Sequence, residues 1–321
     1  MNDRVFIHAA AALGPRGDYL PTQRQLLNAD PPPLALKELT RTITGQHLRQ
    51  ASHFVELAAI GAGVCARRAG GALPADTAVY LGTGLAEVRK NAALFAQTLN
   101  AAEALVSPFD FINSANNMAA FYVAKLAGLH ARNLTVTQEM FSFERALELA
   151  YADLRTGRVA QALVGGVDEA KDTRAEQLRH LPLRTDQRMG EGAGWLYLHT
   201  RSEHARGELI SIDEHVGATA DDIGRLARQS AAHRRHGEAL TWLPGMGLTA
   251  ADRTALAHAF HDGVVEDYLA YCGCFFTAAA FGIAMACERG YTAPQLLIHI
   301  NRDSEGRVMA VAIRLLPGTA Y

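Results

Sequence analysis

The cysteines and histidines of this 321-residue chain are the first candidates for chemistry, because these side chains act as nucleophiles and metal ligands. Cys272 and Cys274 are one residue apart, closer than the two-residue spacing typical of zinc and thioredoxin-like sites. No second pair at ligand spacing accompanies them, and Cys65 and Cys287 stand alone. The four cysteines are therefore predicted to be reduced core thiols rather than a metal site or a disulfide framework.

Two further patterns resemble ligand sites but are better explained otherwise. His233 and His236 flank two arginines, whose charge would repel a metal cation, so we predict a solvated helix face there. The LGTG run at residues 81–84 is too short for a dinucleotide-binding loop and lacks its glycine pattern. We therefore expect no metal and no nucleotide cofactor.

The run TVTQEMFSFERALELAYADLRTGRVAQALVGGVDEA, residues 135–170, is arranged like a nucleophile elbow. A short strand at 134–136 leads through a tight turn into an amphipathic helix that ends near Gly157, and a second strand follows. In this layout a reactive side chain occupies the turn at the helix N-terminus. The residue there is Met140, whose thioether has no acidic proton. Met140 is therefore a poor candidate nucleophile.

Composition limits the classes of function. Hydrophobic residues make up 49% and charged residues 20% of the chain, and the formal net charge is −2. This balance gives no electrostatic argument for nucleic acid or an anionic membrane as partner. No stretch approaches the ~18 apolar residues of a membrane span, and the N-terminal run does not resemble a signal peptide. We expect a cytoplasmic protein with no membrane insertion.

Strands alternate with helices along the whole chain, which indicates an α/β protein whose sheets are covered by helices. Strands are predicted at 4–13, 77–82, 161–170, 190–200 and 208–217, with a closing hairpin at 295–303 and 308–316. Helices are predicted at 54–71, 114–128, 249–263 and 277–290. A polar break at 200–207 divides the chain into residues 1–200 and a shorter second half, 201–321, in a similar order of elements.

Five segments, in order, make the chain resemble the β-ketoacyl synthases of the thiolase fold. They are RVFIHAAAALGPRG, YLGTG, SPFDFINSANNMAA, the run from Ala146 to Ala170, and GEGAGWLYL. The resemblance extends from end to end of the chain. It implies a five-layered αβαβα fold with two similar halves, assembled as a dimer.

The resemblance also locates three catalytic positions, and none keeps its residue. The cysteine nucleophile is replaced by Met140, as counted from Gly157 and from the double glycine that follows. The first histidine is replaced by Pro244 in WLPGMGLTAAD, and the second by Cys274 in LAYCGCFFTAAAFG, with Leu269 in place of a lysine. HINRDSEGR replaces the glycine-rich Phe-Gly loop, and the segments that build the cap over the acyl tunnel are short. The chain is therefore predicted to be a pseudoenzyme.

Type II polyketide systems contain such an inactive subunit, the chain-length factor, which dimerises with an active β-ketoacyl synthase and shapes the acyl tunnel. The resemblance favours this role in polyketide, aryl polyene or fatty-acid-like biosynthesis, with an acyl carrier protein as a further partner. It places candidate tunnel and interface residues on two segments: Phe109, Phe111, Asn113, Met118, Phe121 and Tyr122 on the first, and Thr135, Val136, Thr137 and Gln138 on the second.

Three alternatives remain open at this point. Cys274 could act as a displaced nucleophile with His215 or His299 as base, which would make the protein an atypical acyltransferase or condensing enzyme. A decarboxylase could use Gln138, in a register shifted by two residues. A homodimer could bind acyl chains as a scaffold. Asp168 and Glu191 lie at strand ends in the family register and are predicted to be structural carboxylates.

Overall fold

The computed structural model describes residues 4–32, 34–99, 107–171, 173–181 and 183–321, and the side chain of Phe109 lies outside the described part. The strands are β1 (Val5–Leu13), β2 (Ala78–Gly82), β3 (Asn133–Val136), β4 (Gln161–Asp168), β5 (Gly192–His199), β6 (Gly207–His215), β7 (Ala239–Pro244), β8 (Val264–Val265), β9 (Gln295–Arg302) and β10 (Val308–Leu315). The α-helices are α1 (Lys37–Thr44), α2 (His53–Arg68), α3 (Val88–Leu99), α4 (Pro108–Asn113), α5 (Met118–Ala127), α6 (Ser142–Arg155), α7 (Arg174–Gln177), α8 (Ala220–Ala231), α9 (Ala250–Ala259), α10 (Leu269–Cys272) and α11 (Ala278–Glu288). Two 3₁₀ turns, η1 (Pro21–Gln23) and η2 (Glu139–Phe141), complete them.

The ten strands form one sheet in which the same five-strand pattern occurs twice. Its order is β3-β2-β4-β5-β1-β6-β10-β9-β7-β8. Adding five to each strand number of the first half gives the second half in reverse order, and the parallel and antiparallel pairings repeat as well. The halves meet where β1 and β6 pair antiparallel. The order of the strands thus shows two similar halves.

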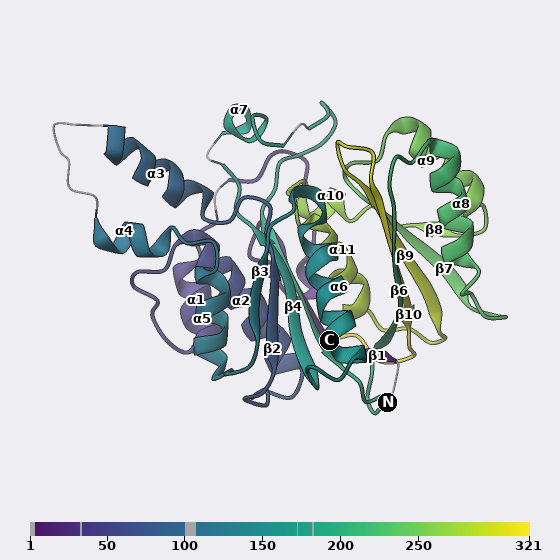
Figure 1. The fold of residues 1–321 in the computed structure, drawn as a ribbon, viewed down its shortest axis with the longest axis horizontal. Helices are drawn as coiled ribbons and strands as arrows, with labels where there is room; N and C mark the ends of the chain where they lie inside the picture. The colour runs from purple at the N-terminus through teal and green to yellow at the C-terminus, as the bar shows by residue number, and fades with distance from the viewer. Residues whose placement is uncertain (1–3, 33, 100–106, 172, 182) are drawn as a thin grey trace.

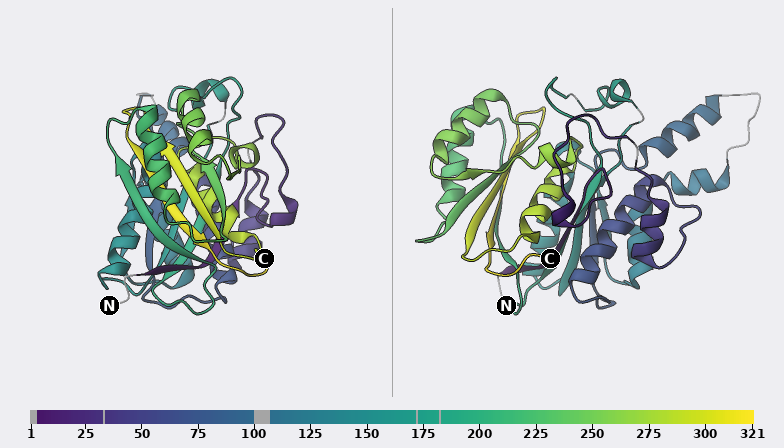
Figure 2. Two further views of the ribbon diagram at one scale, coloured as in Figure 1. Left: turned by 90° about the vertical axis from the view of Figure 1, so that its right-hand side faces the viewer. Right: turned by 180° about the vertical axis from the view of Figure 1, so that it is seen from behind.

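Helices cover both faces of each half, which gives five layers (Figures 1 and 2). Helices α1, α2 and α5 form one outer layer, and α8 and α9 form the other. Helices α6 and α11 lie in the middle, between the two halves of the sheet. The expected αβαβα thiolase-like fold is confirmed, whereas dimer formation stays a prediction.

The hydrophobic core follows these layers, because alternate side chains of each strand point to opposite faces of the sheet. On β9, Leu297 packs toward the middle helices, and its neighbours Leu296 and Ile298 pack toward α8 and α9. A third cluster fills the space between the first half of the sheet and the helices α2 and α5. Helix α11 is buried along its whole length, as its run of small residues predicts.

A buried ion cluster fixes the end of α11 against the N-terminal segment. The carboxylate of Glu288 is fully buried and pairs with Arg24 and Arg68, whose side chains are also almost completely buried. It also accepts a hydrogen bond of 2.9 Å from the backbone N–H of Ala12 on β1. This cluster therefore holds together three segments that are distant in sequence.

Most elements predicted from the sequence are present. Where the structure differs from the prediction, only short segments are affected. Helix α9 begins after Thr249, whose side chain caps it, and β9 and β10 form the predicted hairpin. His233 and His236 are exposed as expected, but they follow the end of α8 at Ala231 and so lie in a turn rather than on a helix. The division into units 1–200 and 201–321 stays a prediction.

Candidate functional site at the elbow

The turn that precedes α6 is held by a hydroxyl at its end. Ser142 Oγ accepts a hydrogen bond from the Gln138 N–H and donates one to the Glu139 carbonyl, both at 2.8 Å. Glu139 has a φ of 45°, in the left-handed region that non-glycine residues rarely adopt. Gly82 lets the helix start come close, because a Cβ there would lie 2.4 Å from the Ser142 carbonyl oxygen. The elbow conformation is thus kept, and the sequence did not single out Glu139.

Met140 lies where three segments meet. Its carbonyl accepts a hydrogen bond of 3.1 Å from Asn301 Nδ2 at the end of β9. Its methyl group faces the turn after β7, since a Cβ added to Gly247 would lie 3.2 Å from Met140 Cε. The half-buried side chain packs against the central core cluster. Met140 therefore fills space at the elbow and offers no ionisable group.

A buried acid–histidine pair lies behind Met140. His299 and Glu144 are both fully buried, and His299 Nε2 is 3.1 Å from Glu144 Oε1. The other ring nitrogen, Nδ1, is 3.1 Å from the Leu243 carbonyl, which only accepts, so Nδ1 carries a proton. Asn301 Nδ2 also donates to Glu144 Oε1. With both ring nitrogens engaged, His299 is a structural group and has no free nitrogen to serve as a base.

Pro244 and Cys274 are both buried. Pro244 is the buried last residue of β7, and its ring has no proton to exchange. Cys274 follows α10, is 1% exposed, and belongs to the cluster against which Met140 packs. Burial raises the pKa of the Cys274 thiol to about 12, so the thiolate is scarce near neutral pH. All four cysteines are buried and unpaired, as predicted.

Asp168 and Glu191 are structural carboxylates, which confirms their prediction. Asp168 accepts hydrogen bonds from Thr83, Gly84 and Leu85 through one oxygen, and from the backbone and side chain of Thr277 through the other. It thereby joins the turn after β2 to the start of α11. Glu191 is bound by His53 and by the backbone N–H groups of residues 34 and 170.

Comparison with known proteins agrees with this geometry. Residues 43–180 match the family model of the β-ketoacyl synthase N-terminal domain. The matched segment includes the elbow and α6. By sequence alone, no curated protein matches it.

Three solved structures are similar to this chain over nearly its full length. The ishigamide ketosynthase/chain length factor has 19% identity and a TM-score of 0.78, with 98% of this chain and 99% of that chain covered. AntDE:AntF, a type II PKS acyl-carrier protein in complex with its ketosynthase bound to the hexaketide, has 14% identity, a TM-score of 0.74, and coverage of 98% and 100%. The PfaC keto synthase-chain length factor has 14% identity and a TM-score of 0.74, with 99% of this chain and 43% of that chain covered.

The candidate interface residues differ in how far their side chains are exposed. Asn113 is buried and donates a hydrogen bond of 3.2 Å to the Gln50 carbonyl, and Gln138 Oε1 accepts one of 3.1 Å from Arg145 Nε. Phe111 and Phe121 are exposed, at 66% and 49%. Met118, Tyr122, Thr135 and Val136 are half-buried, and Thr137 is exposed. Phe109 lies on α4, but its side chain is outside the described part.

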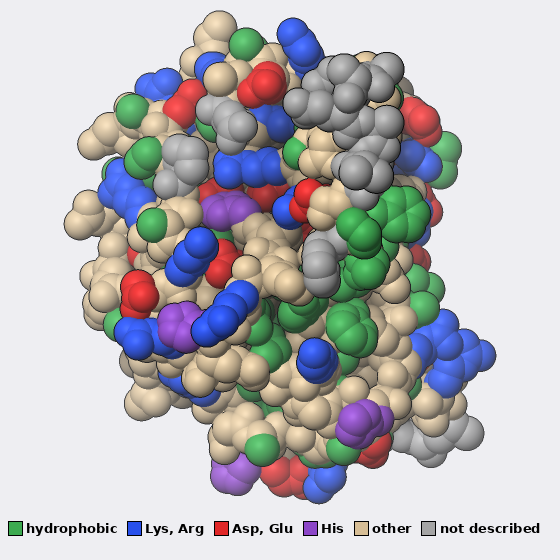
Figure 3. Space-filling view, turned by 90° about the vertical axis from the view of Figure 1, so that its left-hand side faces the viewer, with side chains coloured by type: hydrophobic (Ala, Val, Ile, Leu, Met, Phe, Trp, Pro, Cys, Tyr) green, Lys and Arg blue, Asp and Glu red, His purple; other side chains and the backbone are tan. Residues whose placement is uncertain are grey.

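The exposed aromatic residues belong to a larger apolar surface, which we call the arm surface. Helices α3 and α4 project from the body beside α5 (Figure 1). The face of the molecule that includes them shows hydrophobic side chains gathered together (Figure 3). The exposed members of the arm surface are Phe95, Leu99, Phe111, Ile112 and Phe121. Soluble proteins rarely expose such groups of large apolar side chains without a binding role.

The arm surface lies beside a free sheet edge. β3 is the first strand of the sheet and pairs only with β2 among the described residues. An unpaired edge offers backbone donors and acceptors to another chain. β3 therefore remains available for pairing, as the family resemblance predicts.

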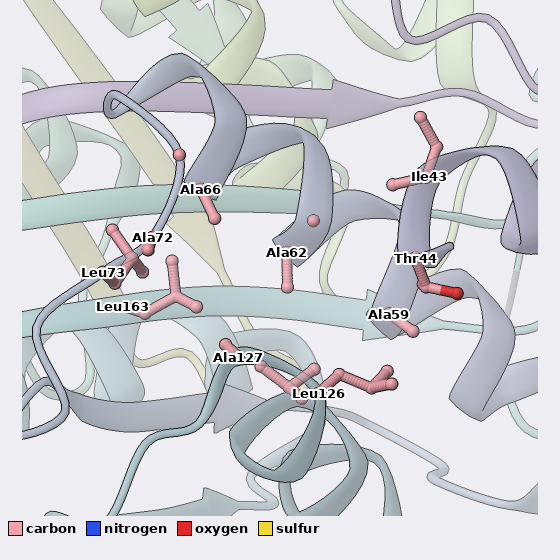
Figure 4. A pocket seen from close by; sticks show the side chains of 13 residues that line it. Ile43, Thr44, Ala59, Ala62, Ala66, Ala72, Leu73, Leu126, Ala127 and Leu163 are labelled. Atoms are coloured by element: carbon pink, nitrogen blue, oxygen red, sulfur yellow. The ribbon is translucent and has the colours of Figure 1, made fainter. Parts of the chain in front are cut away.

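A separate apolar cavity of about 240 Å³ lies between α1, α2 and α5 (Figure 4). Its wall consists mainly of small and aliphatic side chains, among them Ile43, Ala62, Leu126 and Leu163. None of the elbow residues lines it. Within the described part of the chain, no group of three histidine, cysteine, aspartate or glutamate side chains is placed to hold a metal ion. No described helix is both long and apolar enough to cross a membrane.

The reactivity of the Cys274 thiol can be measured directly. We expect iodoacetamide to alkylate native Cys274 at pH 7.5 at least about 100-fold more slowly than free cysteine, because the thiol is buried and protonated. Peptide mapping after timed quenching measures this rate, and the urea-unfolded chain, in which all four cysteines react, is the control. Rapid stoichiometric alkylation of the native protein would instead support Cys274 as a nucleophile.

Proposed function

We propose that this chain is a non-catalytic, ketosynthase-like subunit of the chain-length-factor type. It pairs with an active β-ketoacyl synthase and helps to shape the acyl tunnel in polyketide or fatty-acid-like biosynthesis. The observation that carries the proposal is an intact elbow and fold, in which the three positions that the family resemblance assigns to catalysis are filled by Met140, Pro244 and Cys274.

The chemistry of these three residues supports a non-catalytic role. Ketosynthase chemistry needs a thiolate to hold the acyl group, and two proton-bearing side chains to support decarboxylation and the enolate. A thioether and a proline ring supply none of these groups. The Cys274 thiol is held protonated by its burial. His299 is engaged on both ring nitrogens and cannot replace the missing histidines.

The surface supports pairing with another subunit. The free edge of β3 and the arm surface lie on the same side of the first half, and α5 packs next to β3. Large apolar side chains beside an open sheet edge provide both backbone pairing and hydrophobic burial for a partner. A subunit of the same fold would present a matching edge.

The similar structures are consistent with this assignment of partners. Two of them are named as ketosynthase and chain length factor, and another contains a ketosynthase with an acyl-carrier protein. We therefore propose an active ketosynthase as the main partner, and an acyl carrier protein as a transient one. The aryl polyene context stays a proposal from family resemblance.

The first test is the native mass and composition of the tagged protein isolated from its own cells. A one-to-one complex with a ketosynthase-sized subunit is the expected result. A homodimer that contains no second polypeptide would contradict the heterodimer and support an acyl-binding scaffold. Mass spectrometry of the isolated complex identifies the partner in either case.

The degenerate site gives a second prediction. Met140→Cys is expected to yield no ketoacyl product in a condensation assay with acyl- and malonyl-carrier proteins, because Pro244 and Cys274 still replace the two histidines that the chemistry requires. An active ketosynthase assayed with the same carriers is the positive control. Product formed by this single variant would show that the site needs only a nucleophile, which contradicts the proposed loss of all three groups.

A further inference from the structure

Helix α3 joins the body of the protein through a fully buried glutamate. Glu87 immediately precedes α3, and its backbone carbonyl accepts a hydrogen bond of 2.8 Å from the Asn91 N–H in the first turn of that helix. Of the twelve residues of α3, only Val88 is buried, and within the described part of the chain this helix packs mainly against α4 (Figure 1). The position of α3 therefore depends on the contacts made at its first turn.

The carboxyl group of Glu87 is only half satisfied. Ser52 Oγ, at the N-cap of α2, donates a hydrogen bond of 2.6 Å to Glu87 Oε1, whereas the buried Oε2 has no hydrogen-bond partner. The charge of Lys90 acts on Glu87, but the Lys90 ammonium is bound to Asp110 of α4 at 2.7 Å. A buried carboxylate with so little compensation is costly, so the site favours the neutral, protonated form of Glu87.

A second buried carboxyl group acts on the same turn. Glu169, which follows β4, is 2% exposed, and its Oε1 accepts a hydrogen bond of 2.9 Å from the backbone N–H of Arg89. Glu169 thus takes a free donor at the start of α3, where a negative charge is favoured. His53 and Glu191, which pair with each other at 2.9 Å, also act on Glu169. Ionisation of Glu87 would add a second buried negative charge near that of Glu169, which both carboxylates disfavour.

The pKa values agree with this geometry. Burial raises the pKa of Glu87 to about 8, opposed by the hydrogen bond from Ser52 and reinforced by the charge of Glu169. Burial also raises the pKa of Glu169, to about 6, although the Arg89 N–H opposes the shift. Near neutral pH, Glu87 therefore holds a proton while Glu169 is ionised. An exposed glutamate has a pKa of about 4, so opening of the first turn would release the proton of Glu87.

We propose that Glu87 is a proton-dependent latch for the first turn of α3. With its proton, the side chain stays buried against Ser52 and holds the turn closed, and without it the turn opens so that the carboxylate reaches water. The closed state binds the proton more tightly than the open state. Rising pH therefore favours opening between about pH 4 and about pH 8, and has no further effect above that range.

Opening of the latch changes the arm surface. Phe95 and Leu99 of that surface lie on α3, so their position relative to the body depends on the first turn of the helix. The latch belongs to the single chain, and it does not require the proposed partner subunit. Its test is therefore made on the chain alone.

Hydrogen–deuterium exchange of the full chain, followed on the peptide 88–99 between pH 6.5 and pH 9, measures the opening. The rates are corrected for the intrinsic effect of pH on amide exchange, so that the protection factor reports the closed state. We expect the protection of α3 to fall at least about fivefold from pH 6.5 to pH 7.5, about tenfold being the limit for one proton, and to level off above pH 8.5. β10 is the internal reference, and its protection is expected to stay constant.

Three variants test the assignment to Glu87. Glu87→Gln keeps an oxygen that can accept from Ser52 but cannot ionise, so the protection of α3 is expected to be independent of pH in this range. Glu56→Gln removes another buried glutamate, on α2, and is the matched control that is expected to keep the wild-type dependence. Glu169→Gln removes the neighbouring charge and lowers the pKa of Glu87, so the protection is expected to level off at a lower pH. This last variant keeps the latch testable where Glu87→Gln fails to fold.

The latch is ruled out if the protection of α3 in the wild type stays constant or rises between pH 6.5 and pH 7.5. It is equally ruled out if Glu87→Gln retains the wild-type dependence, because the titrating group then lies elsewhere. Levelling off at an unchanged pH in Glu169→Gln would contradict the coupling of the two carboxyl groups at this turn.

Discussion

Replacing Glu288 by alanine is expected to destabilise the fold by about 3–5 kcal/mol, because it leaves two guanidinium groups buried without their counter-ion. Arg24 and Arg68 keep hydrogen bonds to backbone carbonyls of β1 and of Tyr19, but their charges are no longer balanced. The backbone N–H of Ala12 also loses its acceptor. Urea denaturation followed by circular dichroism measures the change in the free energy of unfolding.

Two other variants separate the buried charge from simpler effects. Glu288→Gln retains an oxygen that can accept from Ala12 but removes the charge, so an intermediate loss is expected. Glu305→Ala removes an exposed glutamate that pairs with Arg307 at 3.2 Å, and a change below about 1 kcal/mol is expected. A loss for Glu288→Ala no larger than that for Glu305→Ala would show that the cluster contributes little to stability.

The fold could be predicted from the sequence because its signals are local and repeated. The family spacing, counted back from Gly157 and from the double glycine, gives the same elbow residue, Met140, in both cases. Strands buried on both faces, such as QALVGGVD in β4, are recognisable by their continuous apolar character. Asp168 is the last residue of such a strand, where a carboxylate commonly has a structural role in the turn.

What could not be predicted depends on contacts between distant segments. The approach of Gly247 to Met140 joins residues more than a hundred positions apart, and no local pattern indicates it. The left-handed conformation of Glu139 has no glycine or asparagine in the sequence to signal it. Helices α3 and α4 were missed because their large apolar residues point to solvent, against the usual periodicity.

Phe111→Glu and Phe121→Glu are expected to weaken the complex with the ketosynthase partner by at least about 30-fold each, and together to abolish it. Both side chains are largely exposed in the single chain, so the variants are expected to fold normally. In the complex, however, each introduced carboxylate would be buried against an apolar partner surface without a counter-ion. Size-exclusion chromatography of the co-expressed subunits, with affinity measured by titration, detects the loss.

The repeated topology of the chain provides the matched control for this prediction. β8 is the counterpart of β3 at the opposite end of the sheet, and it also exposes large apolar residues, with Val264 at 64%. Val264→Glu adds the same charge to an exposed apolar residue at the other end of the sheet, so the complex is expected to persist. If Val264→Glu abolished the complex and the two phenylalanine variants kept it, the partner would bind at the β8 edge. That result would contradict pairing with β3. β3 and β8 have equivalent positions at the edges of their halves. A difference in complex formation between these variants would therefore be caused by the side chains of the arm surface, and not by a property that both edge strands share.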